Sequence, residues 1–255
     1  MKKNSILKFF VCLFVSLMAS SAFAQDGSIL GMPALTSSVG ENGEATYSLS
    51  LQILVLMTVL TLVPSIVLGM TAFTRVIIVL SILRQALGTQ QTPPNQVLIA
   101  IALFITFYVM SPIFEILYET ALNPYLEGTT SAQAALSIAT DLLKEFMVAN
   151  TRSSTMNMFA EMAGEGPFED TQAIPLSIVL PSFITSELKT AFEIGFLIFM
   201  PFLVIDFVIA SILMSLGMMM LSPMLISLPF KLLLFVLVDG WAMTIGSLSS
   251  TFVVG

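Results

Sequence analysis

The stretch "PSFITSELKTAFEIGFLIFMPFLVIDFVIASILMSLGMMMLSP" (residues 181–223) decides the class of fold. Its apolar part, roughly residues 191–214, can cross a bilayer, because a transmembrane helix needs about 20 predominantly apolar residues. A second apolar block follows at residues 224–250. Open sheet edges cannot face lipid, because their backbone groups would lack hydrogen-bond partners. The two blocks therefore predict a pair of helices.

The whole chain shares this apolar composition. Of its 255 residues, 56% are hydrophobic and 10% are charged, whereas a soluble domain averages about 25% charged residues. We therefore expect an all-α polytopic membrane protein. Histidine is absent and Cys12 is the only cysteine, so the usual general base near neutral pH and the usual metal ligands are missing. We expect no catalytic site, no bound metal and no cofactor.

Residues 1–24 have the three parts of a secretory signal peptide. Three lysines lie near its start, the apolar run "FFVCLFVSLMA" forms its centre, and Ala22-Phe23-Ala24 is a small-x-small cleavage site. We predict cleavage after Ala24; the alternative is an uncleaved first transmembrane helix. Cleavage removes 3 of the 9 basic residues and leaves 6 against 16 acidic residues. This acidic balance argues against a nucleic-acid partner.

Four hydrophobic helical segments remain after the predicted cleavage. The first two spans lie at residues 49–73 and 96–114, and Pro64 and Gly69 are candidate kinks near the first. The divisions that we predict are a signal peptide at 1–24, an N-terminal extracytoplasmic segment at 25–48 with little regular structure, a first hydrophobic helical pair at 49–114, a periplasmic helical domain at 115–187 and a second hydrophobic helical pair at 188–255.

Residues 115–187 differ in composition from the segments around them, since they hold 10 of the 16 acidic residues. Within them, apolar residues recur at helical spacing from Leu136 to Met147. Thr130 and Gln133 have the spacing of a capping box at the start of that helix. The pattern predicts a small helical domain on one side of the membrane.

The orientation follows from the signal peptide. If residue 25 lies outside, the first span enters the cytoplasm, and the connection at residues 75–95 is cytoplasmic. Arg75 and Arg84 lie there, as the positive-inside tendency expects. Residues 115–187 are then periplasmic.

Asp206 and Lys231 interrupt the last two apolar blocks. An ionised side chain at a helix centre costs about 2.5–3.5 kcal/mol on insertion scales, so such residues need partners or water. Asp206 lies 11 residues before Gly217 and Lys231 lies 14 after it, which places them at similar depths in a hairpin. We predict a buried charge pair, within a subunit or between subunits. In the alternative, Lys231 reaches the headgroups and Asp206 faces a wet groove; a proton-relay role for Asp206 is less favoured.

Asp239 and Trp241 belong to the sequence "VDGW" in the last apolar block. Tryptophan is enriched at membrane–water interfaces, where its ring is partly in lipid and its N–H meets water. We interpret the two residues as an interface anchor.

Met218, Met219 and Met220 are consecutive, so on a helix they would face three directions. Their position between Gly217 and Pro223 favours a loop or a broken helix. Methionine is flexible and polarizable and re-packs around varied surfaces. The run is therefore either packing filler in a turn or, in several copies around an axis, a soft apolar ring that seals a pore.

Three blocks closely resemble the FliP family of flagellar export-gate membrane proteins, which is related to SctR of virulence type III secretion. They are "PPNQVLIAIALFITFYVMSP" (93–112), residues 181–223 as quoted above, and "ISLPFKLLLFVLVDGW" (226–241). The resemblance extends over essentially the whole chain from residue 49.

The resemblance implies a homo-oligomeric ring of helical hairpins in the bacterial inner membrane, within the flagellar basal body. It implies FliQ and FliR family partners, FlhA and FlhB family proteins on the cytoplasmic side, and unfolded exported proteins as cargo. The family's pore-constricting methionine loop falls on Met218, Met219 and Met220, and its paired charges fall on Asp206 and Lys231. The gate would project to the periplasmic side, with Phe146 and Phe159 as candidate subunit-interface residues.

Three alternatives stay open from the residues. An ion-coupled small-solute transporter would use Asp206 and Lys231, although no inverted repeat supports it. A virulence type III paralogue is less favoured, because the signal peptide is more typical of the flagellar branch. An intramembrane hydrolase lacks histidine and a serine–lysine site. The sequence also lacks a P-loop, so energy for transport would come from elsewhere.

Overall fold

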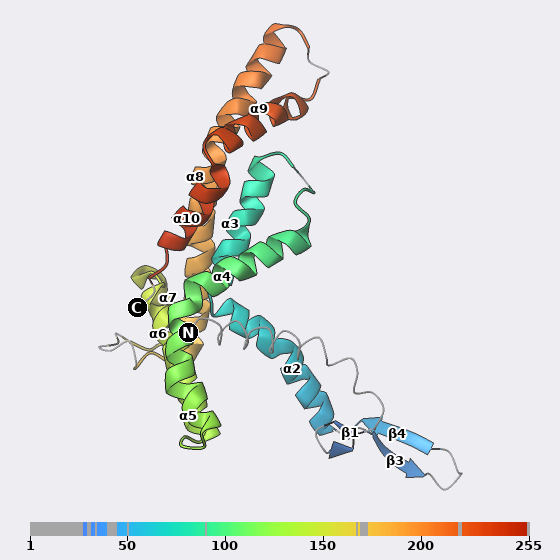
Figure 1. The fold of residues 1–255 in the computed structure, drawn as a ribbon, viewed down its shortest axis with the longest axis vertical. Coiled ribbons are helices and arrows are strands. Elements are labelled where there is room, and N and C mark those ends of the chain that lie inside the picture. The colour runs from blue at the N-terminus through green and yellow to red at the C-terminus, as the bar shows by residue number, and fades with distance from the viewer. Residues whose placement is uncertain are drawn as a thin grey trace. The chain divides into compact units, whose positions relative to one another are not determined.

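The computed structural model describes residues 51–253, apart from residues 90, 167, 169–172 and 219–220, and four short strands before them (Figure 1). The predicted signal peptide, residues 1–24, lies outside the described residues. The chain divides into two compact units, residues 1–64 and 65–255. Each unit is described below by itself.

The first unit contains two antiparallel pairs of strands followed by most of helix α2 (Leu51–Gly69). Strand β1 (Ser28–Ile29) pairs with β2 (Met32–Pro33), and β3 (Leu35–Val39) pairs with β4 (Ala45–Leu49). We expected little regular structure here. The sequences "LTSSV" and "ATYSL" contain the valine, threonine and tyrosine that strands favour.

Helices are the regular secondary structure in the described residues of the second unit, and short loops connect them, as the composition predicts. Its elements, in chain order, are α3 (Phe73–Ala86), α4 (Asn95–Leu117), the π-helix η2 (Tyr118–Leu122), α5 (Asn123–Leu126), α6 (Ala132–Ala149), α7 (Ser153–Ala163), α8 (Leu176–Ser215), α9 (Pro223–Leu237) and α10 (Gly240–Ser250).

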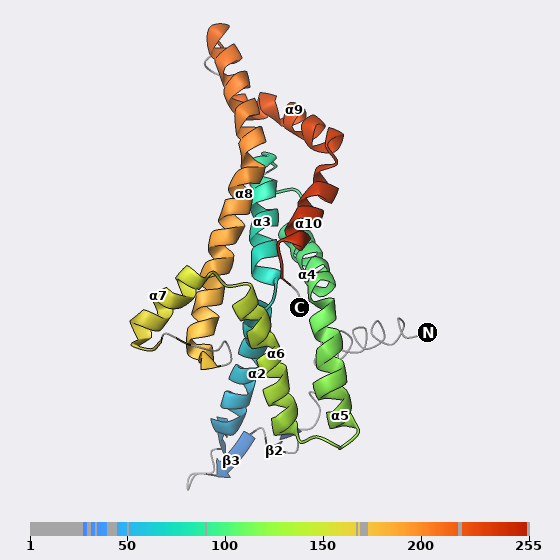
Figure 2. The same cartoon turned by 90° about the vertical axis from the view of Figure 1, so that its left-hand side faces the viewer.

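Helix α8 organises the second unit, because α3, α6, α7 and α9 all pack against it (Figures 1 and 2). It runs for 40 residues through Pro181 and Pro201, and it crosses without a break the boundary at 187/188 that composition suggested. Gly195 allows α3 to come close, since a Cβ at this position would overlap the Ile82 side chain.

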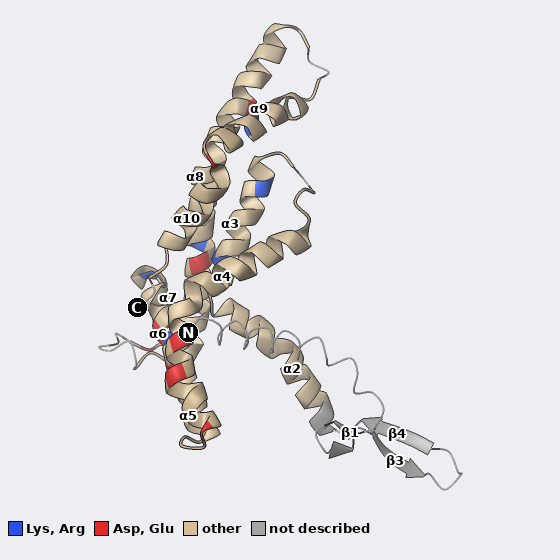
Figure 3. Cartoon of the chain, viewed as in Figure 1, with Lys and Arg blue, Asp and Glu red and all other residues tan. Residues whose placement is uncertain are grey.

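The core of this unit lies where α3, α4, α6 and α8 meet. Its most deeply buried members, each at most 1% exposed, include Val76, Val79, Leu80, Met110, Met147 and Phe183. The second half of α8 and helix α9 instead expose large apolar side chains, among them Phe196, Leu197, Phe207 and Leu233. Figure 3 shows how few charges lie on these two segments.

Membrane-spanning capacity follows from helix length and apolarity. Two helical runs qualify, Asn95–Leu126 and Leu176–Ser215, and the count rises to four if the bent pairs α2–α3 and α9–α10 each form one span. Helix α2 continues through Pro64 and ends at Gly69, so of the two candidate kinks the break occurs at the glycine. The part of the chain that the structure describes thus supplies two to four candidate membrane-spanning segments.

Helix α6 departs from its predicted start by one residue. Ser131, rather than Thr130, is the N-cap, and its hydroxyl accepts a hydrogen bond from the Ala134 amide at 3.3 Å. Phe146 and Met147 are buried as the spacing predicts, but Leu136 is 70% exposed. The apolar stripe is therefore covered only in its second half.

Candidate functional site

Asp206 and Lys231, on α8 and α9, form an ion pair inside one subunit. Lys231 Nζ donates to Asp206 Oδ2 at 2.6 Å, and Ser227 Oγ donates to Asp206 Oδ1 at 2.6 Å. The lysine is 2% exposed, whereas the aspartate side chain is 32% exposed. Both carboxylate oxygens therefore have a donor, and the pair links the two helices that flank the methionine run.

Lys231 also reaches a third helix. Its Nζ donates to the carbonyl oxygen of Ala86 at 3.2 Å, and Ala86 is the last residue of α3. The last carbonyls of a helix carry a partial negative charge that attracts a cation. Sequence reasoning missed Ser227 and Ala86, although Ser227 precedes Lys231 by four residues and so lies on the same face of α9.

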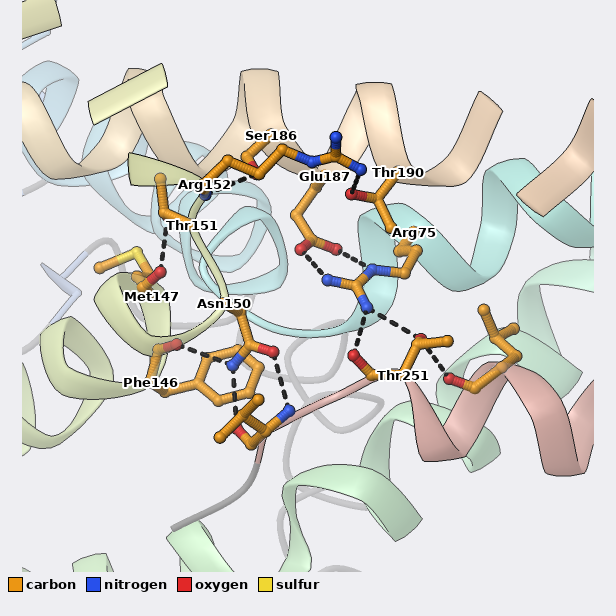
Figure 4. Close-up of polar contacts among 12 residues, drawn as sticks. Arg75, Phe146, Met147, Asn150, Thr151, Arg152, Ser186, Glu187, Thr190 and Thr251 are labelled. Carbon is orange, nitrogen blue, oxygen red and sulfur yellow. Dashed lines mark hydrogen bonds and ion pairs between the residues drawn. The ribbon is translucent and has the colours of Figure 1, made fainter. Parts of the chain in front are cut away.

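A second buried ion pair joins Arg75 on α3 to Glu187 on α8 (Figure 4). Arg75 Nε donates to Glu187 Oε2 at 2.8 Å, and Nη2 donates to Oε1. Arg75 is 2% exposed and Glu187 is 0% exposed. We placed Arg75 in a cytoplasmic connection and Glu187 in a periplasmic domain. The two assignments cannot both hold, because the side chains touch.

Arg152 ties the start of α7 to α8 on the same side of the unit (Figure 4). Its amide donates to Ser186 Oγ at 3.1 Å, and its guanidinium donates to Thr190 Oγ1 at 3.3 Å and forms an ion pair with Glu193. The side chains of this ion pair are 36% and 50% exposed. Exposed pairs contribute little stability, so the buried pairs matter more for the fold.

The methionine loop, residues 216–222, connects α8 to α9. Gly217 has φ +70°, the left-handed conformation that favours glycine. The Gly217 amide donates to the Met214 carbonyl, and the Met218 amide donates to the Leu213 carbonyl at 3.0 Å. These two bonds form a Schellman helix end, and α9 then begins at Pro223.

The predicted seal residues are only partly described. Met218 is 43% exposed, and Met219 and Met220 lie outside the described residues. The end of α8 and the start of α9 agree with the predicted interruption of the helix. The sealing role stays a prediction.

Asp239 and Trp241 form the corner between α9 and α10. Asp239 has φ 49° and ψ 54°, a conformation that non-glycine residues rarely adopt. The next residue, Gly240, has no room for a Cβ against the Phe235 ring. Trp241 packs edge-on against Phe235, with ring centroids 5.5 Å apart. The interface-anchor role stays a prediction beside this structural one.

Phe146 and Phe159, the candidate subunit-interface residues, lie at different depths. Phe146 is 3% exposed, and its ring contacts Phe183 and Phe252 at centroid distances of 6.0 and 6.5 Å. Phe159 is half-buried against the same core. An effect of Phe146 on assembly would therefore act through packing within the subunit. Within the described residues, no cluster of three Asp, Glu, His or Cys side chains is arranged to hold a metal ion.

These features define a class of protein, a helical membrane protein with two distinguishing properties. Buried ion pairs link its helices, and the helix pair α8–α9, which the methionine loop joins, exposes large apolar side chains. Comparison with known families is more specific. The FliP family profile matches residues 56–248, and the chain belongs to the FliP family.

Relatives support this assignment along most of the chain. A flagellar biosynthetic protein FliP from Cereibacter sphaeroides is 64% identical over 222 residues, which cover 87% of this chain and 73% of the relative. The protein of that name from Pectobacterium carotovorum is 48% identical, covering 92% and 89%. The Bacillus subtilis protein is 49% identical, covering 85% and 96%.

Proposed function

We propose that this chain is a pore-forming, non-enzymatic subunit of the flagellar type III export gate, which passes unfolded flagellar proteins across the inner membrane. Membership of the FliP family carries the proposal, since a relative that is 64% identical is named a flagellar biosynthetic protein. Several copies of the chain would form a ring with FliQ and FliR family subunits, and FlhA and FlhB family proteins would join it. The gate would project to the periplasmic side.

Within this gate, we assign Met218, Met219 and Met220 to a flexible seal. The loop leaves α8 through a glycine-dependent helix end and joins α9 at a proline, so neither helix can extend into it. Asp206 and Lys231 bind the two flanking helices together, with Ser227 and Ala86 as further partners. A firm support with a run of flexible, unbranched methionine side chains between its helices suits a seal that yields to a passing chain and then closes.

The paired state of Asp206 favours this proposal over an ion-coupled transporter. Its two carboxylate oxygens accept hydrogen bonds from Ser227 and Lys231. Both partners belong to the same subunit, so the carboxylate joins α8 to α9, which is a structural role.

The test replaces Met218, Met219 and Met220 together with alanine. We expect assembled complexes that still export flagellar proteins but let ions leak across the membrane, measured as the rate of membrane depolarisation in cells. Met243→Ala is the matched control, because Met243 is an exposed methionine on α10, away from the loop. A triple variant that stays as ion-tight as this control would contradict the sealing role.

A further inference from the structure

Phe252, the second residue after α10, belongs to the core, whereas Thr251 and Val253 on either side of it are exposed. Phe252 is 8% exposed. Its ring stacks on Phe146 at a centroid distance of 6.5 Å and an angle of 21°, and the guanidinium carbon of Arg75 lies 3.9 Å from the ring centroid. The aromatic ring is thus in contact with another ring and with a buried cation, an arrangement that favours both stacking and cation–π attraction.

Arg75 divides its hydrogen bonds between two distant parts of the chain (Figure 4). Nε and Nη2 donate to Glu187, whereas Nη1 donates to the Thr251 carbonyl at 3.0 Å and to Thr251 Oγ1 at 2.9 Å. A buried charged group that loses its partners is strongly destabilising. Arg75 therefore needs Thr251 as well as Glu187 to be satisfied.

Asn150, at the end of α6, holds the next part of the segment. Its Nδ2 donates to the Val253 carbonyl at 2.9 Å, and its Oδ1 accepts from the Val253 amide at 3.0 Å. The same Nδ2 donates to the Phe146 carbonyl, which fixes the orientation of the amide group. The side chain of Asn150 thus pairs with the Val253 backbone in the way that a neighbouring strand would.

These contacts close a long excursion of the chain. From Glu187 the polypeptide follows α8, passes through the methionine loop and returns along α9 and α10 to Thr251. Glu187 and Thr251, the two ends of this path, both accept hydrogen bonds from the guanidinium of Arg75. Along the returning arm, α10 buries only Gly240, Thr244 and Leu248. The fully buried face of α10 is thus narrow, although Ile245 and Trp241 add partly buried contacts.

We propose that Thr251–Val253 form a clasp with Arg75 and Asn150, and that this clasp controls local opening of α10. When the clasp detaches, α10 leaves α4 while the Asp206–Lys231 pair still holds α9 against α8. When it is closed, α10 is fixed to the same junction that buries Arg75 and Glu187. The clasp is independent of the proposed export function, since it concerns which part of this chain opens first.

The test is hydrogen exchange of the detergent-purified full chain, followed by mass spectrometry. In Asn150→Ala, the amides of α10 should exchange about 10- to 100-fold faster than in the wild type, because two hydrogen bonds that hold the clasp are lost. Exchange within residues 176–195 of α8 should not change. Thr251→Val keeps the backbone carbonyl and shape but loses one acceptor for Arg75, so we expect a smaller change in the same segment.

Ser250→Ala is the matched control, since Ser250 is exposed and its hydroxyl donates to the Ser247 carbonyl within α10. It should exchange like the wild type. The proposal is overturned if α10 exchanges at the wild-type rate in Asn150→Ala and in Thr251→Val, or if the acceleration is uniform along the chain. If Asn150→Ala cannot be purified in folded form, Thr251→Val alone decides between these outcomes.

Discussion

Lys231 and Asp206 lie on the two helices that flank the methionine loop, and their Nζ and Oδ2 atoms are 2.6 Å apart. The groups around this pair favour a cation at position 231 and an anion at position 206. The ammonium lies against the Ala86 carbonyl at the end of α3, and the carboxylate accepts from the Ser227 hydroxyl. The pair is thus one member of a network that joins three helices.

Lys231→Met should lower the free energy of unfolding by about 2–4 kcal/mol, since it removes one partner of a largely buried pair and leaves Asp206 without its cation. The loss is smaller than for a fully buried pair, because the Asp206 side chain is 32% exposed. Thermal unfolding in detergent measures it. Lys189→Met, at an exposed position on α8, is the control and should differ by less than about 0.5 kcal/mol.

The double exchange Asp206→Lys with Lys231→Asp tests the direct contact. It should be more stable than either single exchange but less stable than the wild type, because a carboxylate at position 231 would face the Ala86 carbonyl. A double variant no more stable than the two singles would show that the side chains do not interact directly.

Local patterns were sufficient to predict parts of this architecture. The apolar blocks predicted the helices, Gly217 and Pro223 predicted the interruption between α8 and α9, and the hairpin spacing placed Asp206 near Lys231. Each of these inferences uses residues within about 25 positions of one another. Helix periodicity and hairpin geometry operate on that scale.

Contacts between distant residues could not be predicted in the same way. Composition assigned Glu187 to an acidic periplasmic domain, but its partner Arg75 lies 112 residues earlier. Only the packing of α3 on α8 brings the two together and makes burial of Glu187 tolerable. Ser131 was missed for another reason, since the end of a helix depends on which of several adjacent polar residues turns toward the backbone. The two strand pairs were missed because the composition of residues 25–48 outweighed the strand-favouring residues within them.

Glu187→Gln should lower the free energy of unfolding by about 3–5 kcal/mol, because it leaves the Arg75 charge buried without a counter-ion. The same substitution six residues later, Glu193→Gln, is the control. The Arg152–Glu193 pair is half-exposed, so it should contribute only about 0–1 kcal/mol. Chemical denaturation of both variants in detergent makes the comparison, and equal losses would mean that burial does not distinguish the two pairs.

The corner between α9 and α10 should respond in opposite directions to two neighbouring substitutions. Asp239→Gly should stabilise by about 0.5–1 kcal/mol, because glycine adopts positive φ without the Cβ strain that aspartate carries. Gly240→Ala should destabilise by about 1–3 kcal/mol, because its Cβ would overlap the Phe235 ring. Melting temperatures of the two variants provide the measurement. Stabilisation by both, or destabilisation by both, would contradict the corner geometry.

Gly195→Ala should show whether α3 and α8 pack as closely as the structure indicates. The new Cβ would overlap the Ile82 side chain, so we expect a loss of about 1–3 kcal/mol from overpacking. Gly246→Ala, on α10, has no atom within 4 Å of the added Cβ, and it should stabilise by up to about 1 kcal/mol because alanine favours the helix.

Adding Ile82→Val to Gly195→Ala removes the methyl group that the new Cβ would overlap, so the double variant should recover part of the lost stability. If Gly195→Ala is as stable as Gly246→Ala and Ile82→Val only adds to the loss, the two helices do not meet at this glycine.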